Sequence, residues 1–318
     1  MPEHYPPEKR IFSKISLTPE QHIVLLKKRG LIFQDDTRAC HYLRFIGYFR
    51  LSGYFIPFQI PGDPQHTFLP QTTFDQALQV YIFDRKLRLL VMDAVERIEV
   101  AIRTTISDVM GLAHGPHWYM DKSLFVDRYN HKKLINTIAF ESGREGDGPQ
   151  RSNRQNLKQN TFCKHYYEAY HTPEFPPIWM LTEILTMGNW SIIYKHLRHP
   201  QDKKNIADFY GIHPTLLISW LEAFTDLRNQ CAHHGRIWNR TFTKKPKIPK
   251  NKSIGKHFRD NSRFYAHAAV LNILLKVISD GSSWQHRLAE LIHGSPHISI
   301  EQMGFIANWD KDPFWGMT

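Results

Sequence analysis

Residues 217–240 read LISWLEAFTDLRNQCAHHGRIWNR, and the apolar residues of this stretch recur with the period of an α-helix. Their steps of three and four residues place one stripe on a single helix face, formed by Leu217, Trp220, Phe224, Leu227 and Cys231. The opposite side carries the polar residues Asp226, Asn229 and His233. Gly235 stands where a helix commonly ends. The stretch therefore predicts a helix with one buried face and one polar face, ending near its two histidines.

The same helical period governs most of the chain. A long helix is predicted from about residue 74 to residue 110, with an apolar stripe made of Leu87, Val91, Ala94, Ile98 and Ile102. Thr18-Pro19-Glu20-Gln21 has the residues of a capping box, and Gly30 marks the end of the helix that it begins. Sustained alternation of polar and apolar residues is missing, as is a strand–glycine–helix phosphate loop. The sequence predicts an all-α fold.

The composition is that of a globular chain with a basic excess. Among 318 residues, 41 are Lys or Arg and 30 are Asp or Glu, which gives a formal net charge of +11. This charge favours a polyanionic partner and excludes an acidic solvating protein. The length and the three widely spaced cysteines exclude a small disulfide-stapled scaffold. We recognise no signal peptide and no apolar run of bilayer length, so we expect a cytoplasmic protein without a membrane partner.

The chain is expected to divide into three parts. Residues 1–72 form an N-terminal helical and aromatic region, residues 73–291 a helical core, and residues 292–318 a C-terminal tail that packs on the core. Within the core, residues of about 141–160 are rich in Gly, Pro and Arg and lack apolar residues over most of their length, which predicts a mobile surface loop. A basic loop is expected at 243–256.

Two stretches allow two interpretations each. The aromatic residues between 41 and 58 are typical of a buried helix and turn, and the alternative is a base-stacking surface flanked by Arg44 and Arg50. The basic loop is either a solvated loop or a sequence-independent phosphate-binding patch. Its candidate RNA-binding residues are Lys244, Lys245, Lys247, Lys250 and Lys252.

Arg228 and His233 have the chemistry needed to cleave RNA by attack of its own 2′-hydroxyl. A histidine acts as general base or acid near neutral pH, and an arginine binds phosphate and stabilises its charge, so that no metal is needed. The two residues are five apart, and an ideal helix directs them about 140° away from each other. They can converge if the helix is distorted or if two copies meet across a two-fold axis, which favours a composite site in a dimer.

Non-catalytic interpretations of the same residues are also possible. An arginine followed by a histidine five positions later is common by chance. Asp226, Asn229 and His233 can be ordinary polar residues of a surface helix. His233 and His234 point to different helix faces and have no third ligand placed by spacing, so we expect no metal site.

Residues 228–240 resemble the signature of the Abi-like bacterial abortive-infection proteins of the AbiD/AbiF type. These belong to the HEPN superfamily of helical ribonucleases, whose motif is an arginine, a polar residue and a histidine. Arg228, Asn229 and His233 match these positions. Further similar stretches occur in the same order along the chain: residues 12–14, 47–54, 83–88, 96–99, 177–180 and 303–305. One departure is Gln230, where the family mostly has a small apolar residue.

The resemblance implies a HEPN-like helical bundle with additional N- and C-terminal helices that forms a homodimer. It also implies a metal-independent endoribonuclease without cofactors, used as a toxin in phage defence, with RNA as substrate and a cognate non-coding RNA as a possible inhibitor. The resemblance implies that His233 is the general base or acid, that Arg228 holds the scissile phosphate, and that Asn229 orients the imidazole or the RNA. The second-tier candidates are Asp226, His234, Arg236, Glu96, Glu99 and Arg103.

Other functions compete with this one. Glu99 and Arg103 stand at i and i+4, so they can simply stabilise their helix. A non-catalytic RNA-binding or scaffold protein of a defence system would have the same basic surface. A partnership with a nucleotidyltransferase is a third possibility, although this chain has no Gly-Ser and paired-Asp signature of its own.

Overall fold

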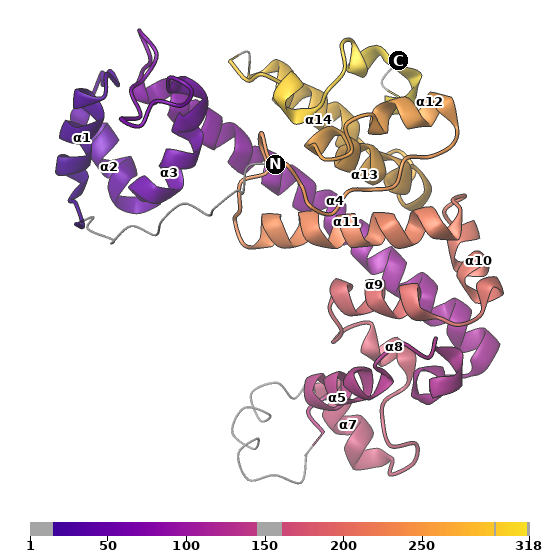
Figure 1. The fold of residues 1–318 in the computed structure, drawn as a ribbon. Helices are drawn as coiled ribbons and strands as arrows, with labels where there is room; N and C mark the ends of the chain where they lie inside the picture. The colour runs from indigo at the N-terminus through magenta and orange to yellow at the C-terminus, as the bar shows by residue number, and fades with distance from the viewer. Residues whose placement is uncertain (1–14, 145–160, 296, 317–318) are drawn as a thin grey trace, which may run out of the picture. The chain divides into compact units, whose positions relative to one another are not determined.

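The computed structural model describes residues 15–144, 161–295 and 297–316. Within these ranges the regular structure consists of α-helices and short 3-10 turns, with three isolated β-bridges and no strand (Figure 1). The predicted all-α fold is confirmed. The loop predicted at about 141–160 lies almost wholly outside the described residues.

The chain forms two compact units, residues 1–83 and residues 84–318, called unit 1 and unit 2 below. The division falls inside the long helix α4 (Phe74–His114), whereas the sequence analysis placed it ahead of that helix, between 72 and 73. The helix also continues one turn beyond the predicted end near residue 110.

Unit 1 contains α1 (Pro19–Lys28), α2 (Asp36–Ile46), α3 (Tyr48–Phe55), a 3-10 turn at Ile56–Phe58 and the first turns of α4. The capping box predicted for α1 is confirmed: Thr18 Oγ1 accepts from the Gln21 N–H at 3.3 Å, and Gln21 Oε1 accepts from the Thr18 N–H at 2.8 Å. Gly30 follows the helix with a φ of +92°, a conformation that glycine adopts without steric cost.

The aromatic residues of unit 1 divide between core and surface. Tyr54 and Phe55 are buried, whereas Phe45 is 73% exposed and Phe49 is 92% exposed. Gly47, with a φ of +89°, separates α2 from α3, so one helical face does not continue across both. The prediction of a buried aromatic helix is therefore wrong for Phe45 and Phe49.

Unit 2 is assembled around α11 (Pro214–Ala232). The other helices are the rest of α4, α5 (His131–Glu141), α7 (Thr161–Ala169), α8 (Ile178–Leu181), α9 (Met187–His196), α10 (Pro200–Asp208), α12 (Lys252–Gly255), α13 (Phe264–Ile278) and α14 (Trp284–His293). Helix α11 packs against α9, α10 and α13, and it lies across α4 (Figure 1). The first turns of α11 lie next to α10, and Arg228 near its C-terminal end contacts Glu99 of α4.

The residues after α14 pack on α13 through aromatic rings. Short 3-10 turns at Glu301–Met303, Trp309–Lys311 and Pro313–Trp315 bury Trp309 and Trp315 next to Tyr265. The indole Nε1 of Trp315 donates to the Tyr265 hydroxyl at 3.2 Å, so the buried indole N–H is satisfied.

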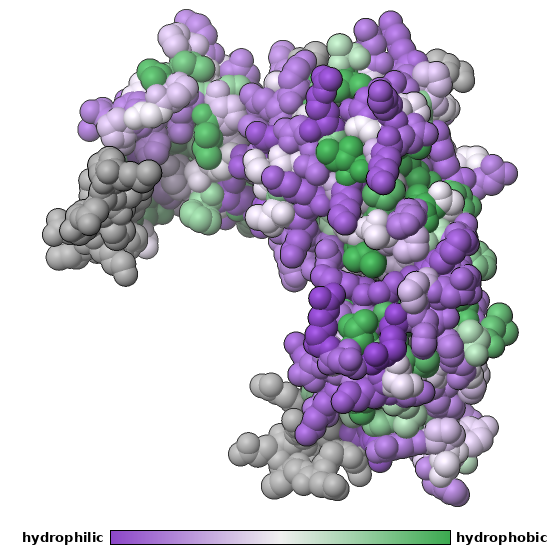
Figure 2. Space-filling model, turned by 45° about the vertical axis from the view of Figure 1, so that its right-hand side comes forward, coloured by the Kyte–Doolittle hydropathy of each residue, from purple (hydrophilic) through white to green (hydrophobic). Residues whose placement is uncertain are grey.

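The face drawn in Figure 2 is mostly hydrophilic, with apolar side chains scattered between polar ones. Among the residues that the structure describes, no helix combines the length and the apolar character that crossing a bilayer requires.

Candidate active site

The apolar stripe predicted on α11 is buried. Leu217, Trp220, Phe224, Leu227 and Cys231 are each at most 4% exposed. On the other faces, Arg228 is partly exposed and Asn229 is exposed. The packing of the stripe therefore fixes the rotation of α11 and presents Arg228 and Asn229 away from the core.

Arg228 forms an ion pair with α4. Its Nε lies 3.4 Å from Oε2 of Glu99, whose side chain is only 11% exposed. Arg103, one turn along α4, places a guanidinium nitrogen 3.8 Å from the other oxygen of Glu99 and donates to the carbonyl oxygen of Thr182 at 2.7 Å. One carboxylate thus lies between two guanidinium groups, and Asp93 and Glu96 add two further acidic side chains to the lining of the same groove.

These residues line an open groove of about 480 Å³. Glu96, Glu99 and Arg103 come from α4, and Arg228 comes from α11. The structure therefore brings three of the second-tier candidates next to Arg228. Asn229 lies beside them, with its Oδ1 3.4 Å from a terminal nitrogen of Arg228.

His233 is the residue at which α11 ends. Its N–H donates to the carbonyl oxygen of Asn229 at 3.0 Å, and its side chain is exposed. Within the described part of the chain the imidazole makes no hydrogen bond or ion pair, and it does not line the Arg228 groove. Convergence of Arg228 and His233 through a second copy of the chain stays a prediction.

The turn after His233 has a backbone conformation that is unusual for its residues. His234 has a φ of +57°, in the left-handed region that normally favours glycine. The His234 N–H donates to Cys231 at 3.0 Å and the Gly235 N–H donates to Gln230 at 2.7 Å, which is the Schellman pattern. The sequence suggested Gly235 for the end of the helix, but the left-handed position is occupied by His234. Such strain is often found at functional sites.

A family model described as Abi-like protein matches residues 41–239, which is more than half of the chain. The chain belongs to the Abi-like family. Comparisons with curated proteins and with solved structures found no match. The residues matched by the family model include Arg228, Asn229 and His233 together with the α4 residues of the groove, and they end before the basic loop.

In this Abi-like protein, the residues that follow His234 are held by a carboxylate that the sequence analysis missed as a site residue. Asp84 is fully buried, forms an ion pair with Arg88, and accepts from the N–H groups of Ile237 at 3.1 Å and Trp238 at 2.7 Å. The sequence did contain an indication of this role. Asp84 lies three residues before Leu87, which is one step of the apolar stripe of α4. A charged residue in a buried stripe indicates a buried partner.

Cys231 lies in the same buried region. Burial, with the charge of Asp84 acting in the same direction, raises the pKa of the Cys231 thiol to about 12. The thiol is therefore protonated at neutral pH and is a poor nucleophile. This thiol belongs to the core.

The basic loop is shorter than predicted and tightly held. Helix α12 begins at Lys252, so the extended part covers residues 243–251. The lysine side chains Lys244, Lys245, Lys247, Lys250 and Lys252 are all exposed. Side chains of neighbouring elements hydrogen-bond to the backbone: Trp220 and Ser219 to Lys247, Asn261 to Pro246 and His267 to Lys244, at 3.0 to 3.2 Å. The backbone is fixed while the ammonium groups face solvent.

The remaining second-tier candidates lie apart from the groove. Asp226 is half-buried. Burial lowers the pKa of His267, and the negative charge of Asp226 acts in the opposite direction. Arg236 is half-buried, and its carbonyl oxygen accepts from Arg240 at 3.5 Å. In the described residues, no three His, Cys, Asp or Glu side chains are grouped as metal ligands.

Proposed function

We propose that this Abi-like protein is a metal-independent endoribonuclease that acts as the toxin of a phage-defence system. Membership of the Abi-like family indicates an abortive-infection defence protein. The observation that carries the enzymatic proposal is Arg228, a partly exposed cation on the helix that ends in the exposed His233. The nearly buried Glu99 of α4 orients its guanidinium group. We further propose a HEPN-like bundle and a cognate non-coding RNA as inhibitor.

The proposed reaction is transfer of the phosphodiester to the neighbouring 2′-oxygen. His233 removes the proton of the 2′-hydroxyl, the 2′-oxygen forms a bond to phosphorus, and the bond from phosphorus to the 5′-oxygen breaks. The leaving 5′-oxygen takes a proton from an imidazolium, so the products carry a 2′,3′-cyclic phosphate and a 5′-hydroxyl. Arg228 stabilises the additional negative charge at phosphorus, and its Nε–H stays on Glu99.

We propose that the site is completed by a second copy of the chain. Arg228 and His233 are about 140° apart around the helix axis, so one copy alone does not direct both to one phosphate. A mixture of Arg228→Ala and His233→Ala chains tests this. With a composite site, half of randomly formed dimers contain one intact site, and cleavage recovers to about a quarter of wild type. Sites made by one chain would show no recovery.

The activity itself is tested by cleavage of single-stranded RNA in EDTA, with identification of the product ends. Wild type should yield 2′,3′-cyclic phosphate ends, and His233→Ala should yield none. His286→Ala is the matched control, because His286 is an exposed histidine on α14 and should cleave like wild type. Equal cleavage by the His233→Ala protein would refute the role of His233.

The second candidate function is non-catalytic RNA binding within a defence system. It is favoured by the fixed lysine segment in unit 2 and, separately, by the exposed Phe45 and Phe49 with Arg44 in unit 1. Absence of cleavage after removal of co-purified RNA, with RNA affinity that falls on Lys→Gln substitution, would support it. Each lost phosphate contact should reduce the slope of log K against log salt by about one.

A further inference from the structure

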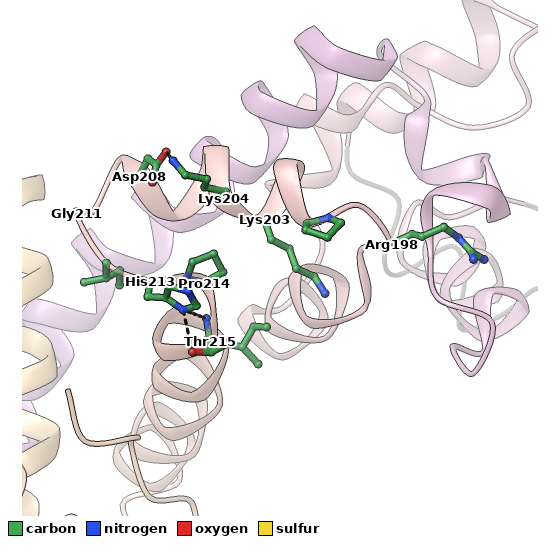
Figure 3. A pocket seen from close by; sticks show the side chains of 11 residues that line it. Arg198, Lys203, Lys204, Asp208, Gly211, His213, Pro214 and Thr215 are labelled. Atoms are coloured by element: carbon green, nitrogen blue, oxygen red, sulfur yellow. Dashed lines mark hydrogen bonds and ion pairs between the residues drawn. The ribbon is translucent and has the colours of Figure 1, made fainter. Parts of the chain in front are cut away.

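A second cavity of unit 2 lies between α10 and the first turns of α11 (Figure 3). Its volume is about 740 Å³, within the range of small-molecule sites. It is separate from the candidate active site, because Thr215 in its wall is about 27 Å along α11 from His233. The Arg228 groove and this cavity share no lining residue.

Part of the lining of this cavity is apolar. Pro200, Ile212, Pro214 and Ile218 form it. His213 lies at its edge, and its Nδ1 accepts from the Thr215 N–H at 3.3 Å, so the imidazole is held in place. Two proline rings and a fixed imidazole offer flat faces against which a planar ring system can pack.

Two of the basic residues that line the cavity have ion-pair partners, and one does not. Lys204 pairs with Asp208, and Arg198 pairs with Asp127 and donates to the carbonyl oxygen of Ser123. Lys203 makes no ion pair or side-chain hydrogen bond within the described ranges. Figure 3 shows its side chain extending from α10 into the space beside α11, while the charged ends of Lys204 and Arg198 turn away.

Among the described residues no carboxylate pairs with Lys203, and Asp208 in the lining pairs with Lys204 instead. Burial, followed by the charge of Arg128, lowers the pKa of the Lys203 ammonium. A bound anion would stabilise the charged form of this partly buried ammonium group, which lies near a second cation. The positive end of α11 faces the same space and adds to this field.

We propose that this cavity binds a nucleotide, with the phosphate on the Lys203 ammonium and the base against the wall of Pro200, Pro214 and Ile218. The ligand is either a free mononucleotide or the 5′-phosphorylated end of an RNA, because both present this chemistry. An acidic peptide would use the cation but not the flat apolar wall. The proposal does not depend on nuclease activity.

The test is titration calorimetry of the full chain with AMP, adenosine and inorganic phosphate. AMP should bind saturably and more tightly than either part alone. Lys203→Gln should weaken AMP binding about tenfold, through loss of one charge-assisted hydrogen bond. Lys164→Gln is the matched control, because Lys164 is an exposed lysine on α7 that does not line the cavity, and the same charge change there should alter the affinity less than about threefold.

Thr215→Glu is a second variant that keeps the helix intact, because a carboxylate is favourable in the first turn of α11. It should abolish AMP binding without lowering the melting temperature. A 5′-phosphorylated tetranucleotide, added to the His233→Ala chain, distinguishes the sources: displacement of AMP assigns an RNA end, and no displacement assigns a free nucleotide. The absence of saturable AMP binding, equal effects of Lys203→Gln and Lys164→Gln, or displacement of AMP by a Glu-rich peptide would each overturn the proposal.

Discussion

The Nε atom of Arg228 on α11 lies 3.4 Å from the Oε2 atom of Glu99 on α4. The carboxylate is nearly buried, whereas the guanidinium reaches an open groove. A buried acceptor with an exposed donor fixes the direction of the donor better than a surface pair, since the buried side has few alternative conformations. The pair therefore determines where Arg228 can meet a phosphate.

Replacing Glu99 by Gln should lower kcat/KM for RNA cleavage by about tenfold or more, because Arg228 loses the charge that orients it. Steady-state cleavage of a fluorescent RNA measures this. Glu222→Gln is the matched control, since Glu222 on α11 pairs with Lys195 outside the groove. Its activity should stay within about threefold of wild type. If both variants lose activity equally, Glu99 has no special role in positioning Arg228.

His234→Gly should give a more stable protein than His234→Ala, by about 1 kcal/mol. Both variants remove the imidazole, but only glycine adopts the φ of +57° without strain. Urea unfolding of the two variants measures the difference. Equal midpoints would show that the left-handed conformation is not a source of strain.

Asp84→Asn should destabilise unit 2 by about 3–5 kcal/mol, because Arg88 is left as a buried charge without its counter-charge. Thermal unfolding followed by circular dichroism measures the loss. Asp93→Asn is a suitable control: Asp93 also pairs with an arginine four residues later on α4, but it is 41% exposed, so the loss should stay below about 1 kcal/mol. A small effect at Asp84 would mean that the segment after His234 is held by other contacts.

Stability should decrease between pH 6.5 and about 4 because of His257. Burial is the largest cause that lowers its pKa to about 4, and the charges of Lys256 and Lys276 act in the same direction while Asp312 opposes them. Below pH 6.5 the unfolded chain binds a proton that the folded chain does not bind. The contribution of His257 is therefore complete above pH 6.5 and is lost as the pH falls to 4, with a total of about 3 kcal/mol.

The measurement is the free energy of unfolding of wild type and His257→Gln at pH 7 and pH 4. Glutamine keeps a group that can bond to the Tyr265 hydroxyl, which lies 2.7 Å from Nδ1 of His257, but it does not titrate. The variant should lose about 3 kcal/mol less than wild type over this interval. The exposed His286→Gln should keep the full pH dependence. Parallel losses in His257→Gln and wild type would contradict the assignment.

Local patterns predicted the helices, the buried face of α11 and the ion pair within α4. The stripe of α11 and the Glu99–Arg103 pair depend on residues a few positions apart, and both are confirmed. The pairing of Glu99 with Arg228 joins residues 129 positions apart, and helical periodicity contains no information on which helices cross. The exposure of Phe49 was missed for a related reason, because the conformation of Gly47 changes the face on which the next helix begins. The meeting of Arg228 with His233 is still a prediction.

The lysine segment after α11 is held through its carbonyl and amide groups, so the identity of its side chains is not needed for its path. Lys244, Lys245 and Lys247 can therefore change to other residues with little effect on the free energy of folding. Substitutions of these lysines therefore change the attraction of this surface for a polyanion without changing the thermodynamic stability of unit 2. Natural variants can adjust this attraction by single codon changes. Replacing a buried charge such as Asp84 would instead require compensating substitutions.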